Sequence, residues 1–450
     1  MRIFSDTLMV FRSRIVVLLS LVLFPSLLVA MQLVIGSGKG VVYSKFENRL
    51  DWLVMMQNIT ASTELSVVLS EDSVSVNWLR YTDASSSPEL LKIAPSLRFV
   101  SNQPVLNPDD HTGYVLRLTG TVNGATYFRE YIIWVIDYSL YHPVFRNLIP
   151  AAPVKNGCSQ LELTLDGNLP GLTYMNRSGQ TFNIKRQFTI NYETLQWENG
   201  WKTEIVNEAV EIENMKIVIL QPPYKDTWFK LSGDQFAANL GLNQFSIQSG
   251  LYNAIRVIGK ITTEATLRSE KNEGDRPDQI TVLSGSAPLE INFKANPNSP
   301  VANYFRWEIF SGSDLVISRT DEDHRYTFTK SGTYTVKLNT ENTWCSHRDS
   351  VVVKVSESAI HAPNVFTPNA DGVNDEFRVA YRSIIEFKAT IYNRWGNRIY
   401  EWSDPQKGWD GTFNGRPMPE GPYFFVIRAV GSDGLEYELK GDINLLRGKK

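Results

Sequence analysis

The chain has 450 residues, and a length of this size predicts about three or four domains rather than a single hydrophobic core. Its formal net charge of −3 gives no overall basic field that would favour nucleic acid as a partner. Aromatic residues make up 12% of the chain, which favours β structure, and two cysteines are too few for a disulfide-dense scaffold.

The N-terminal segment has the pattern of an export signal. Three arginines precede an uncharged run over residues 15–35, and Ala30 supplies a small residue at a position suited to cleavage. We therefore predict a signal peptide over residues 1–30, with cleavage at points up to residue 36. A retained membrane anchor is the alternative, because an apolar run of this length can just span a bilayer.

The next segment alternates apolar and polar residues with the period of two that is typical of a half-buried strand. Residues 73–81 and 114–138 carry this alternation. Asn123-Gly124 lies between two strand-like runs and predicts a tight hairpin turn. These features predict a β-sandwich-like domain over residues 41–149.

A second all-β domain is predicted over residues 150–267. A proline-containing linker at residues 148–157 precedes it, and a polar, charged stretch at residues 268–279 marks its end. Residues 233–242 have room for a short helix only. The expected strands of this domain are residues 161–165, 187–197, 215–220 and 254–261.

The two cysteines, Cys158 and Cys345, are far apart in the sequence and fall in different predicted domains. We expect two separate thiols, buried or half-buried. A disulfide between domains is the alternative, because the compartments of exported proteins allow disulfides to persist.

We predict a third sandwich over residues 280–356. The stretches YFRWEI (304–309) and YTFTKSGTYTVKL (326–338) resemble the PKD domain, an immunoglobulin-like module. The turn sequence usual in that family is replaced here by WEIFSG (307–312), so the resemblance implies the sandwich fold alone. Trp307 is expected in the core of this sandwich rather than stacked on a ligand.

Five motifs follow one another over residues 362–450. They are PNVFTPNADGVNDEF (363–377), IYNRWGNRIYEW (391–402), GWDGTFNG (408–415), MPEGPYFFVIRA (418–429) and KGDINLLR (440–447). This block resembles the gliding-motility-associated C-terminal domain, which is the type B sorting domain of type IX secretion. Alternating apolar residues and turns at Gly396-Asn397 and Asp433-Gly434 also predict a small sandwich of about seven strands.

The resemblance implies that this block directs export across the outer membrane, so that the protein lies at the cell surface or on the outer membrane. The implied partners are the type IX secretion translocon and an outer-membrane barrel of the PorP/SprF family. The sorting-motif residues are Pro363, Asn364, Phe366, Pro368, Asp371, Gly372, Asn374, Asp375, Trp395, Gly396, Trp409, Asp410, Gly411, Gly421, Tyr423, Gly441 and Arg447.

The loop NADGVND (369–375) is dense in the oxygen ligands that Ca²⁺ prefers. Asn369, Asp371, Asn374 and Asp375 would be the ligands. The loop lacks the distal glutamate of an EF-hand, so we expect a turn in which these side chains accept backbone N–H groups. Calcium is the alternative, and no other cofactor is expected.

The sequence carries no recognisable catalytic motif. Its five histidines are scattered without metal-ligand spacing, and no Gly-x-Ser-x-Gly elbow occurs. We therefore predict a non-enzymatic protein, for which neither a small-molecule substrate nor nucleic acid is an expected partner.

The combined prediction is an all-β, exported protein of tandem immunoglobulin-like β-sandwiches that acts by protein–protein binding. A component of the secretion or gliding apparatus is the leading hypothesis, and a surface adhesin or polysaccharide-binding protein is the alternative. Trp201, beside the turn pair Asn199-Gly200, is the expected partner contact. A polysaccharide site would require solvent-facing tryptophans among Trp78, Trp134, Trp197, Trp201 and Trp228.

Overall fold

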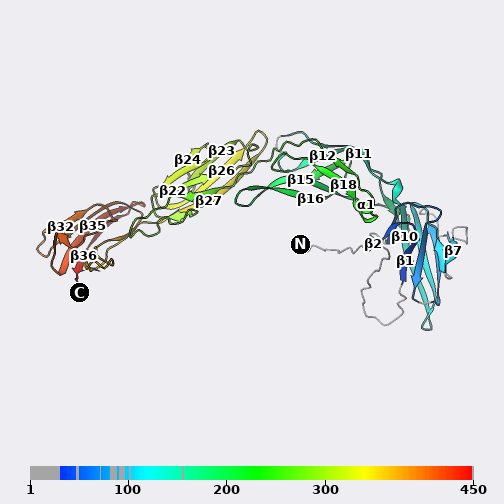
Figure 1. Cartoon of the computed structure of the whole chain (residues 1–450), viewed down its shortest axis with the longest axis horizontal. Coiled ribbons are helices and arrows are strands. Elements are labelled where there is room, and N and C mark those ends of the chain that lie inside the picture. Colours follow the sequence, from blue (N-terminus) through cyan, green and yellow to red (C-terminus); the bar gives the residue numbers. More distant parts are fainter. Residues whose placement is uncertain are drawn as a thin grey trace.

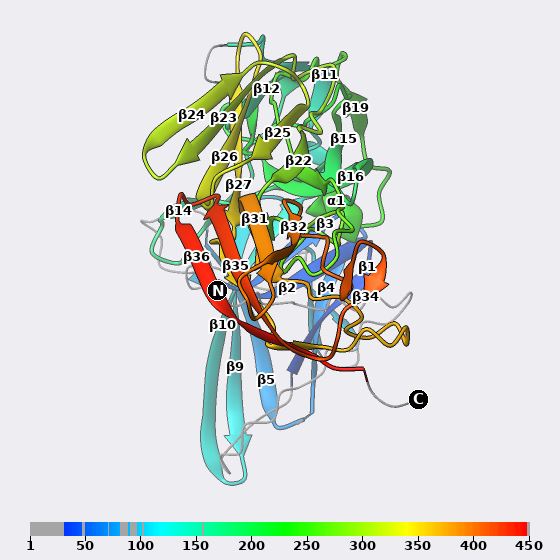
Figure 2. The same ribbon diagram turned by 90° about the vertical axis from the view of Figure 1, so that its left-hand side faces the viewer.

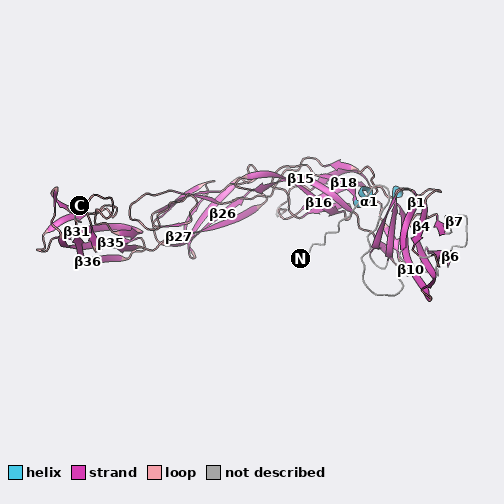
Figure 3. Ribbon diagram, turned by 60° about the horizontal axis from the view of Figure 1, so that its bottom comes forward, coloured by secondary structure: helices cyan, strands magenta, loops and turns pink. Residues whose placement is uncertain are grey.

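The computed structural model describes residues 31–46, 50–70, 72–81, 89–90, 97–100, 103–154 and 157–447. The predicted signal peptide, residues 1–30, lies outside these ranges. Within them the chain is almost entirely strands, arranged as four β-sandwiches that follow one another along an extended molecule (Figures 1 and 3). The predicted all-β fold of tandem immunoglobulin-like sandwiches is confirmed. No helix among the described residues is long and apolar enough to cross a membrane.

The first sandwich has two sheets, of strand order β1-β4-β8-β7 and β2-β3-β10-β9-β5-β6. The expected hairpin is present, with Asn123 and Gly124 both at positive φ in its turn, and it projects away from the rest of the chain (Figure 2). The strands are β1 (Met31–Ser37), β2 (Gly40–Phe46), β3 (Leu50–Met56), β4 (Glu64–Leu69), β5 (Val74–Tyr81), β6 (Glu89–Leu90), β7 (Leu97–Val100), β8 (Gln103–Leu106), β9 (Thr112–Val122) and β10 (Ala125–Asp137).

Strand β3 of this sandwich is buried on both faces, which explains its continuous apolar run. Val54 and Met56 face the core between the two sheets. Leu53 and Met55 face a second cluster, which includes Tyr174 and the helical residues around Phe236 from the second sandwich. The first two sandwiches are therefore joined by a shared apolar core.

The second sandwich has main sheets of order β11-β12-β17 and β16-β15-β18-β19. The short helix expected within residues 233–242 is present as α1 (Gln235–Asn239). The 3-10 helix η1 (Tyr138–Leu140) directly follows β10 of the first sandwich and leads to the second. The other elements of the second sandwich are β11 (Val144–Pro150), β12 (Leu161–Asn168), β13 (Thr173–Met175), β14 (Thr181–Asn183), β15 (Gln187–Trp197), β16 (Trp201–Glu211), β17 (Lys216–Ile219), β18 (Lys230–Asp234) and β19 (Ser246–Gln248).

Two sequence expectations fail in this region. Residues 254–261, which cross to the third sandwich, form no strand. Side chains, rather than a neighbouring strand, accept their backbone N–H groups. Asn298 Oδ1 accepts the N–H of Ile258 at 2.9 Å, and Asp349 Oδ2 accepts that of Ile261 at 2.9 Å. The predicted linker at 148–157 begins inside β11, whose last residue is Pro150 at a strand end, where proline costs no ladder hydrogen bond.

The third sandwich has sheets of order β20-β22-β25 and β21-β27-β26-β23-β24. Trp307 is 1% exposed in its core, as expected, and its indole N–H donates to the carbonyl of Glu322 at 3.1 Å. The strands are β20 (Thr262–Ala265), β21 (Ser284–Gly285), β22 (Leu289–Lys294), β23 (Tyr304–Ser311), β24 (Asp314–Arg319), β25 (His324–Phe328), β26 (Gly332–Glu341) and β27 (Ser346–Val355).

The prediction of two separate thiols is wrong. Cys158, ahead of β12, and Cys345, ahead of β27, form a disulfide between the second and third sandwiches. The two loops meet because a small apolar cluster, including Ile255, Val257 and Ala302, packs around the sulfur atoms.

The C-terminal sandwich has a main sheet of order β29-β36-β35-β31-β32, in which β29 runs parallel to β36. The domain also contains two smaller pairs, β28-β30 and β33-β34. Its strands are β28 (Ala359–His361), β29 (Val365–Phe366), β30 (Ala380–Arg382), β31 (Ile384–Tyr392), β32 (Arg398–Trp402), β33 (Thr412–Phe413), β34 (Arg416–Pro417), β35 (Gly421–Gly431) and β36 (Glu436–Leu445).

Candidate functional site

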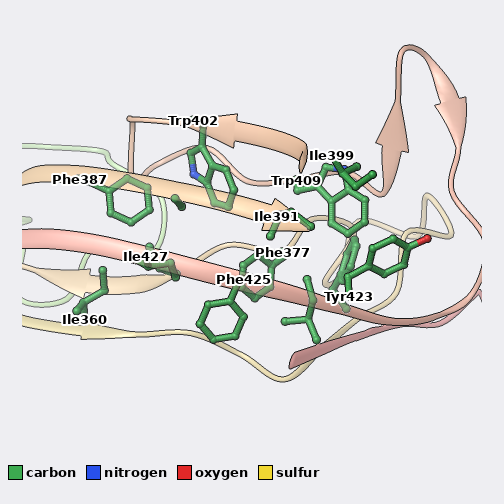
Figure 4. Packing of buried hydrophobic residues seen from close by; sticks show 14 of the residues in the cluster. Ile360, Phe377, Phe387, Ile391, Ile399, Trp402, Trp409, Tyr423, Phe425 and Ile427 are labelled. Carbon is green, nitrogen blue, oxygen red and sulfur yellow. The ribbon is translucent and has the colours of Figure 1, made fainter. Parts of the chain in front are cut away.

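The core of the C-terminal sandwich is made by the alternating residues of its central strands. Along β35, Tyr423, Phe425 and Ile427 face inward, and they meet Phe377 and Trp402 from the flanking segments (Figure 4). Alternation of this kind is what one buried sheet face requires. The motif residues of the sequence therefore enter a single compact core.

Three aromatic motif residues form a chain at the end of the domain that is farther from the third sandwich. The ring of Trp409 lies 5.4 Å from that of Phe366 and 4.9 Å from that of Tyr423, between ring centroids. Trp409 is fully buried, and its indole N–H donates to the carbonyl of Thr412 at 2.8 Å. Asp410 accepts the backbone N–H of Thr412 at 2.9 Å, so the turn expected at this aspartate is present.

Arg447 fastens the end of the last strand to this group of loops. Its guanidinium donates to the carbonyl of Met418 and, at 3.1 Å, to that of Gly411. Gly411 has φ +77°, a backbone conformation that favours glycine, and a side chain there would press on Leu445 and Pro368. Glycine therefore lets the loop lie close to these two residues. Motifs separated by up to eighty residues thus converge on one set of contacts.

The loop at 369–375 directs its side-chain oxygens at its own backbone. Asp375 accepts N–H groups of Asn369 at 3.0 Å, Ala370 at 2.7 Å and Gly372 at 2.8 Å. These bonds, that from Gly372 above all, hold the pKa of Asp375 below its usual value. Asp371 accepts the N–H of Val373 at 2.8 Å.

This geometry has the features expected of an Asx-type turn. Within the described ranges no group of three or more histidine, cysteine or acidic side chains is arranged to hold a metal ion. The calcium hypothesis for Asn369, Asp371, Asn374 and Asp375 remains a proposal, and it would require Asp375 to give up backbone partners.

Trp395 differs from the other motif tryptophan. It is 70% exposed, in the turn between β31 and β32, whereas Trp409 is fully buried. Asn393 Oδ1 builds the turn by accepting the N–H groups of Trp395 and Asn397, each at 3.0 Å. The guanidinium carbon of Arg394 lies 4.3 Å from the centre of the Trp395 ring. The turn is therefore rigidly built, although its tryptophan contributes little to the core.

A segment from outside the C-terminal block forms an isolated β-bridge to β30 of this domain. The N–H of Gly274 donates to the carbonyl of Tyr381 in β30 at 2.8 Å, and the N–H of Tyr381 donates to the carbonyl of Asn272 at 3.1 Å. Arg382 also forms an ion pair with Asp275 at 2.9 Å. The stretch at 268–279, expected only to mark a boundary, is thus a strap that pairs with the C-terminal sandwich.

The strap carries a buried carboxylate. Glu273 is 6% exposed and pairs with Arg268 at 2.8 Å, while the hydroxyl of Ser286 donates to it at 2.7 Å. Desolvation raises the pKa of Glu273, and the bonds from Ser286 and Arg268 oppose this rise. No sequence motif indicated this residue, because its partners are brought together only by the fold.

Trp201 lies between the second and third sandwiches. It is half-buried at the start of β16, and its indole N–H donates to the carbonyl of Asn296 at 3.0 Å. Its ring packs edge-on against Trp197, with centroids 5.0 Å apart. The structure therefore gives Trp201 an intramolecular contact, and its role as a partner contact stays a prediction.

The remaining tryptophans of the first two sandwiches divide by exposure. Trp78 and Trp134 are buried in the first sandwich, so they cannot present a ring to a polysaccharide. Trp228 is 54% exposed.

The fold and the site together describe a protein of tandem immunoglobulin-like sandwiches. Its last domain is stabilised by contacts among the residues of its own sequence motifs. Residues 360–445 match the family model of the CHU_C Type IX secretion signal domain, and residues 151–249 match that of the fibronectin type III domain. The expected secretion domain is confirmed, and this signal supports delivery of the chain by type IX secretion.

The comparison with solved structures finds similarity at low identity and low TM-score. The Sidekick-1 immunoglobulin domains 1–5 are 9% identical, with 90% of this chain and 80% of that chain covered and a TM-score of 0.26. The chicken CNTN1 domains FN1–FN3 are 11% identical, with 68% of this chain and 100% of that chain covered and a TM-score of 0.23. The comparison with curated proteins finds no match. The PKD resemblance of residues 280–356 stays a prediction.

Proposed function

We propose that this chain is a non-enzymatic protein of the cell surface or outer membrane that works by binding another protein. Its C-terminal sandwich is the export signal, and the three preceding sandwiches form a stiff arm that presents the first sandwich at a distance from it. The secretion-signal match at residues 360–445 carries this proposal.

Contacts at each junction support the stiffness of the arm. Arg186 and Asp234 form a buried ion pair, which the hydroxyl of Tyr138 joins from the first sandwich. The disulfide joins the second and third sandwiches. The strap at 268–279 joins the third sandwich to the C-terminal one. Junctions of this kind oppose the relative motion that is usual between domains.

The proposed partner is an outer-membrane barrel of the PorP/SprF family, which would make the protein a component of the secretion or gliding apparatus. The test is full-length protein with an affinity tag inserted in the hairpin turn at 123–124, produced in a host that has type IX secretion. We expect whole cells to expose the tag and the purified protein to retain an outer-membrane barrel after cross-linking. Removal of residues 360–450 should abolish exposure of the tag.

Retention of a glycan in place of a barrel would favour the polysaccharide-binding alternative. Exposure of the tag without residues 360–450 would contradict the export role of the C-terminal sandwich.

A further inference from the structure

A cleft lies between the second and third sandwiches, beside the disulfide that joins them. Its volume is about 330 Å³. Small-molecule sites usually have volumes of about 300–1,000 Å³ and often lie where two domains meet. The second sandwich contributes Pro153, Asp226 and Asn253 to the walls, and the third contributes Pro300, Asn303 and Trp344. This space is called the Trp344 cleft below.

The loop that carries Trp344 is fixed from both sides of the cleft. Asn342 Oδ1 accepts the N–H groups of Trp344 at 2.9 Å and of Cys345 at 2.8 Å. The amide nitrogen of Asn342 donates to the carbonyls of Ile255 at 2.9 Å and Val301 at 3.1 Å, which belong to opposite walls. Cys345 is also held by the disulfide. The walls are therefore in place before a ligand arrives, which lowers the entropic cost of binding.

The rings that line the cleft suit a ligand with an apolar face. The side chain of Trp344 is 38% exposed, and the rings of Pro153 and Pro300 line the same space. Tryptophan combines an apolar ring with a single N–H donor, so it suits a partner that is apolar on one side and polar at its edge. A pyranose sugar is such a partner, because its C–H groups form an apolar face and its hydroxyls lie around the edge of the ring.

Polar groups of the lining are free to bind those hydroxyls. Within the described ranges, the side-chain amides of Asn253 and Asn303 make no hydrogen bond to the protein. Asp226 uses Oδ1 to accept the N–H of Ala254 at 2.7 Å, and its other carboxylate oxygen has no described partner. An amide side chain both donates and accepts, as a sugar hydroxyl does. The free groups therefore match a ligand rich in hydroxyls.

The charge of the lining disfavours other classes of ligand. Asp226 is the only ionisable side chain among the described residues that line the cleft. A phosphate, a sulfate or an acidic polysaccharide would meet a carboxylate and no cation there. A metal ion would find a single carboxylate. The lining is thus suited to an uncharged ligand.

We propose that the Trp344 cleft binds a neutral glycan. One sugar ring stacks on the indole of Trp344, and its hydroxyls bond to Asp226, Asn253 and Asn303. Because the walls come from two sandwiches, the site requires both of them in their disulfide-bonded arrangement. The proposal goes beyond the proposed function, since it gives the arm a ligand of its own whatever the identity of the protein partner.

The test is isothermal titration calorimetry on the purified full-length protein. The neutral probes are cellohexaose, maltohexaose, xylohexaose, mannohexaose and laminarihexaose, and the acidic probe is hexagalacturonate. We expect a neutral probe to bind and hexagalacturonate not to bind. Trp344→Ala and Asn303→Ala should each weaken the binding on the order of tenfold, because each removes a direct contact with the ligand. Both variants should keep the thermal midpoint of the wild type, since both side chains are exposed.

Trp395→Ala is the matched control, because Trp395 is an exposed tryptophan of the C-terminal sandwich and does not line the cleft. This variant should bind the probe like the wild type. The proposal is overturned if no neutral probe binds, if hexagalacturonate binds more tightly than the neutral probes, or if both cleft variants bind like the wild type. A decaproline peptide is titrated as well, because aromatic-lined grooves also bind proline-rich segments. Binding of this peptide and of no neutral probe would overturn the proposal in favour of a protein ligand.

Delivery to the cell surface separates this proposal from the proposed function. Trp344→Ala and Asn303→Ala should be delivered like the wild type, because neither residue belongs to the C-terminal sandwich. A failure of glycan binding would therefore leave the export role standing. Loss of delivery in both variants would show that they disturb the whole protein, and it would overturn the assignment of these residues to a glycan site.

Discussion

Cys158 and Cys345 lie 187 residues apart in the sequence, yet a disulfide joins them and their Cα atoms are 5.8 Å apart. The bond connects the loop before β12 in the second sandwich to the loop before β27 in the third. We expect Cys158→Ser/Cys345→Ser to lose about 3–5 kcal/mol of stability in this pair of sandwiches, because the cross-link closes a long loop in the unfolded chain. Calorimetry on the oxidised wild type and the double variant measures this loss. Identical unfolding profiles would show that the bond contributes nothing.

The junction of the first two sandwiches depends on a buried charge pair. The side chains of Arg186 and Asp234 are 5% and 0% exposed, and burial raises the pKa of Tyr138 beside them. Arg186→Ala leaves the carboxylate of Asp234 without its countercharge, so we expect a loss of about 3–5 kcal/mol in denaturant unfolding. The neighbouring pair of Lys185 with Glu211 is exposed, and Lys185→Ala should cost no more than about 0.5 kcal/mol. Equal losses in the two variants would contradict the importance of the buried pair.

The loop at Asp375 predicts a dependence of stability on pH. Backbone N–H groups hold the pKa of Asp375 below its unfolded value, so its stabilising effect is present above that value and is lost as pH falls through the folded pKa. We expect the thermal midpoint of Asp375→Asn to be lower than that of the wild type at neutral pH and the difference to shrink in acid. Asp314→Asn, an exposed control in β24, should show no such difference.

Calcium distinguishes the two hypotheses for the same loop. An Asx-type turn predicts that added Ca²⁺ leaves the thermal midpoint of the wild type unchanged. A rise with Ca²⁺ that Asp375→Asn and Asp371→Asn both abolish would establish a metal site instead.

The strap predicts a coupling between the third and C-terminal sandwiches. Gly274→Pro removes the N–H that donates to the carbonyl of Tyr381, and we expect faster hydrogen exchange in β30 as it loses this backbone bridge. Gly274→Ala is the matched control: a side chain there would meet only the carbonyl oxygen of Tyr381, at 3.7 Å, and should leave exchange unchanged. Unaltered exchange in the proline variant would mean that the strap does not stabilise β30.

Trp201 offers a choice between a structural contact and a partner contact. The hydrogen bond to Asn296 predicts that Trp201→Phe, which keeps a ring but removes the donor, costs about 1 kcal/mol in unfolding, whereas Trp197→Phe costs less. The partner hypothesis predicts instead that Trp201→Ala leaves the thermal midpoint almost unchanged and weakens capture of the envelope partner. Unfolding curves and pull-down of the same variants separate the two.

Local patterns in the sequence were sufficient to predict the features that depend on neighbouring residues. Period-two alternation over residues 114–138 identified two strands, and the pair Asn123-Gly124 identified the hairpin turn between them, because side-chain direction and backbone φ are local properties. The ordered motifs of the last block identified the secretion domain for the same reason: each is a short, contiguous pattern. The density of Asx residues indicated the turn at 369–375.

Contacts between residues far apart in the chain could be found only from the folded structure. The pairing of Cys158 with Cys345, the burial of Glu273 and the absence of a strand at 254–261 depend on partners far away in the chain. Trp395 and Trp409 stand in similar motifs, and the sequence cannot tell that one is buried and the other exposed. Burial results from the sum of long-range contacts, which local patterns do not encode.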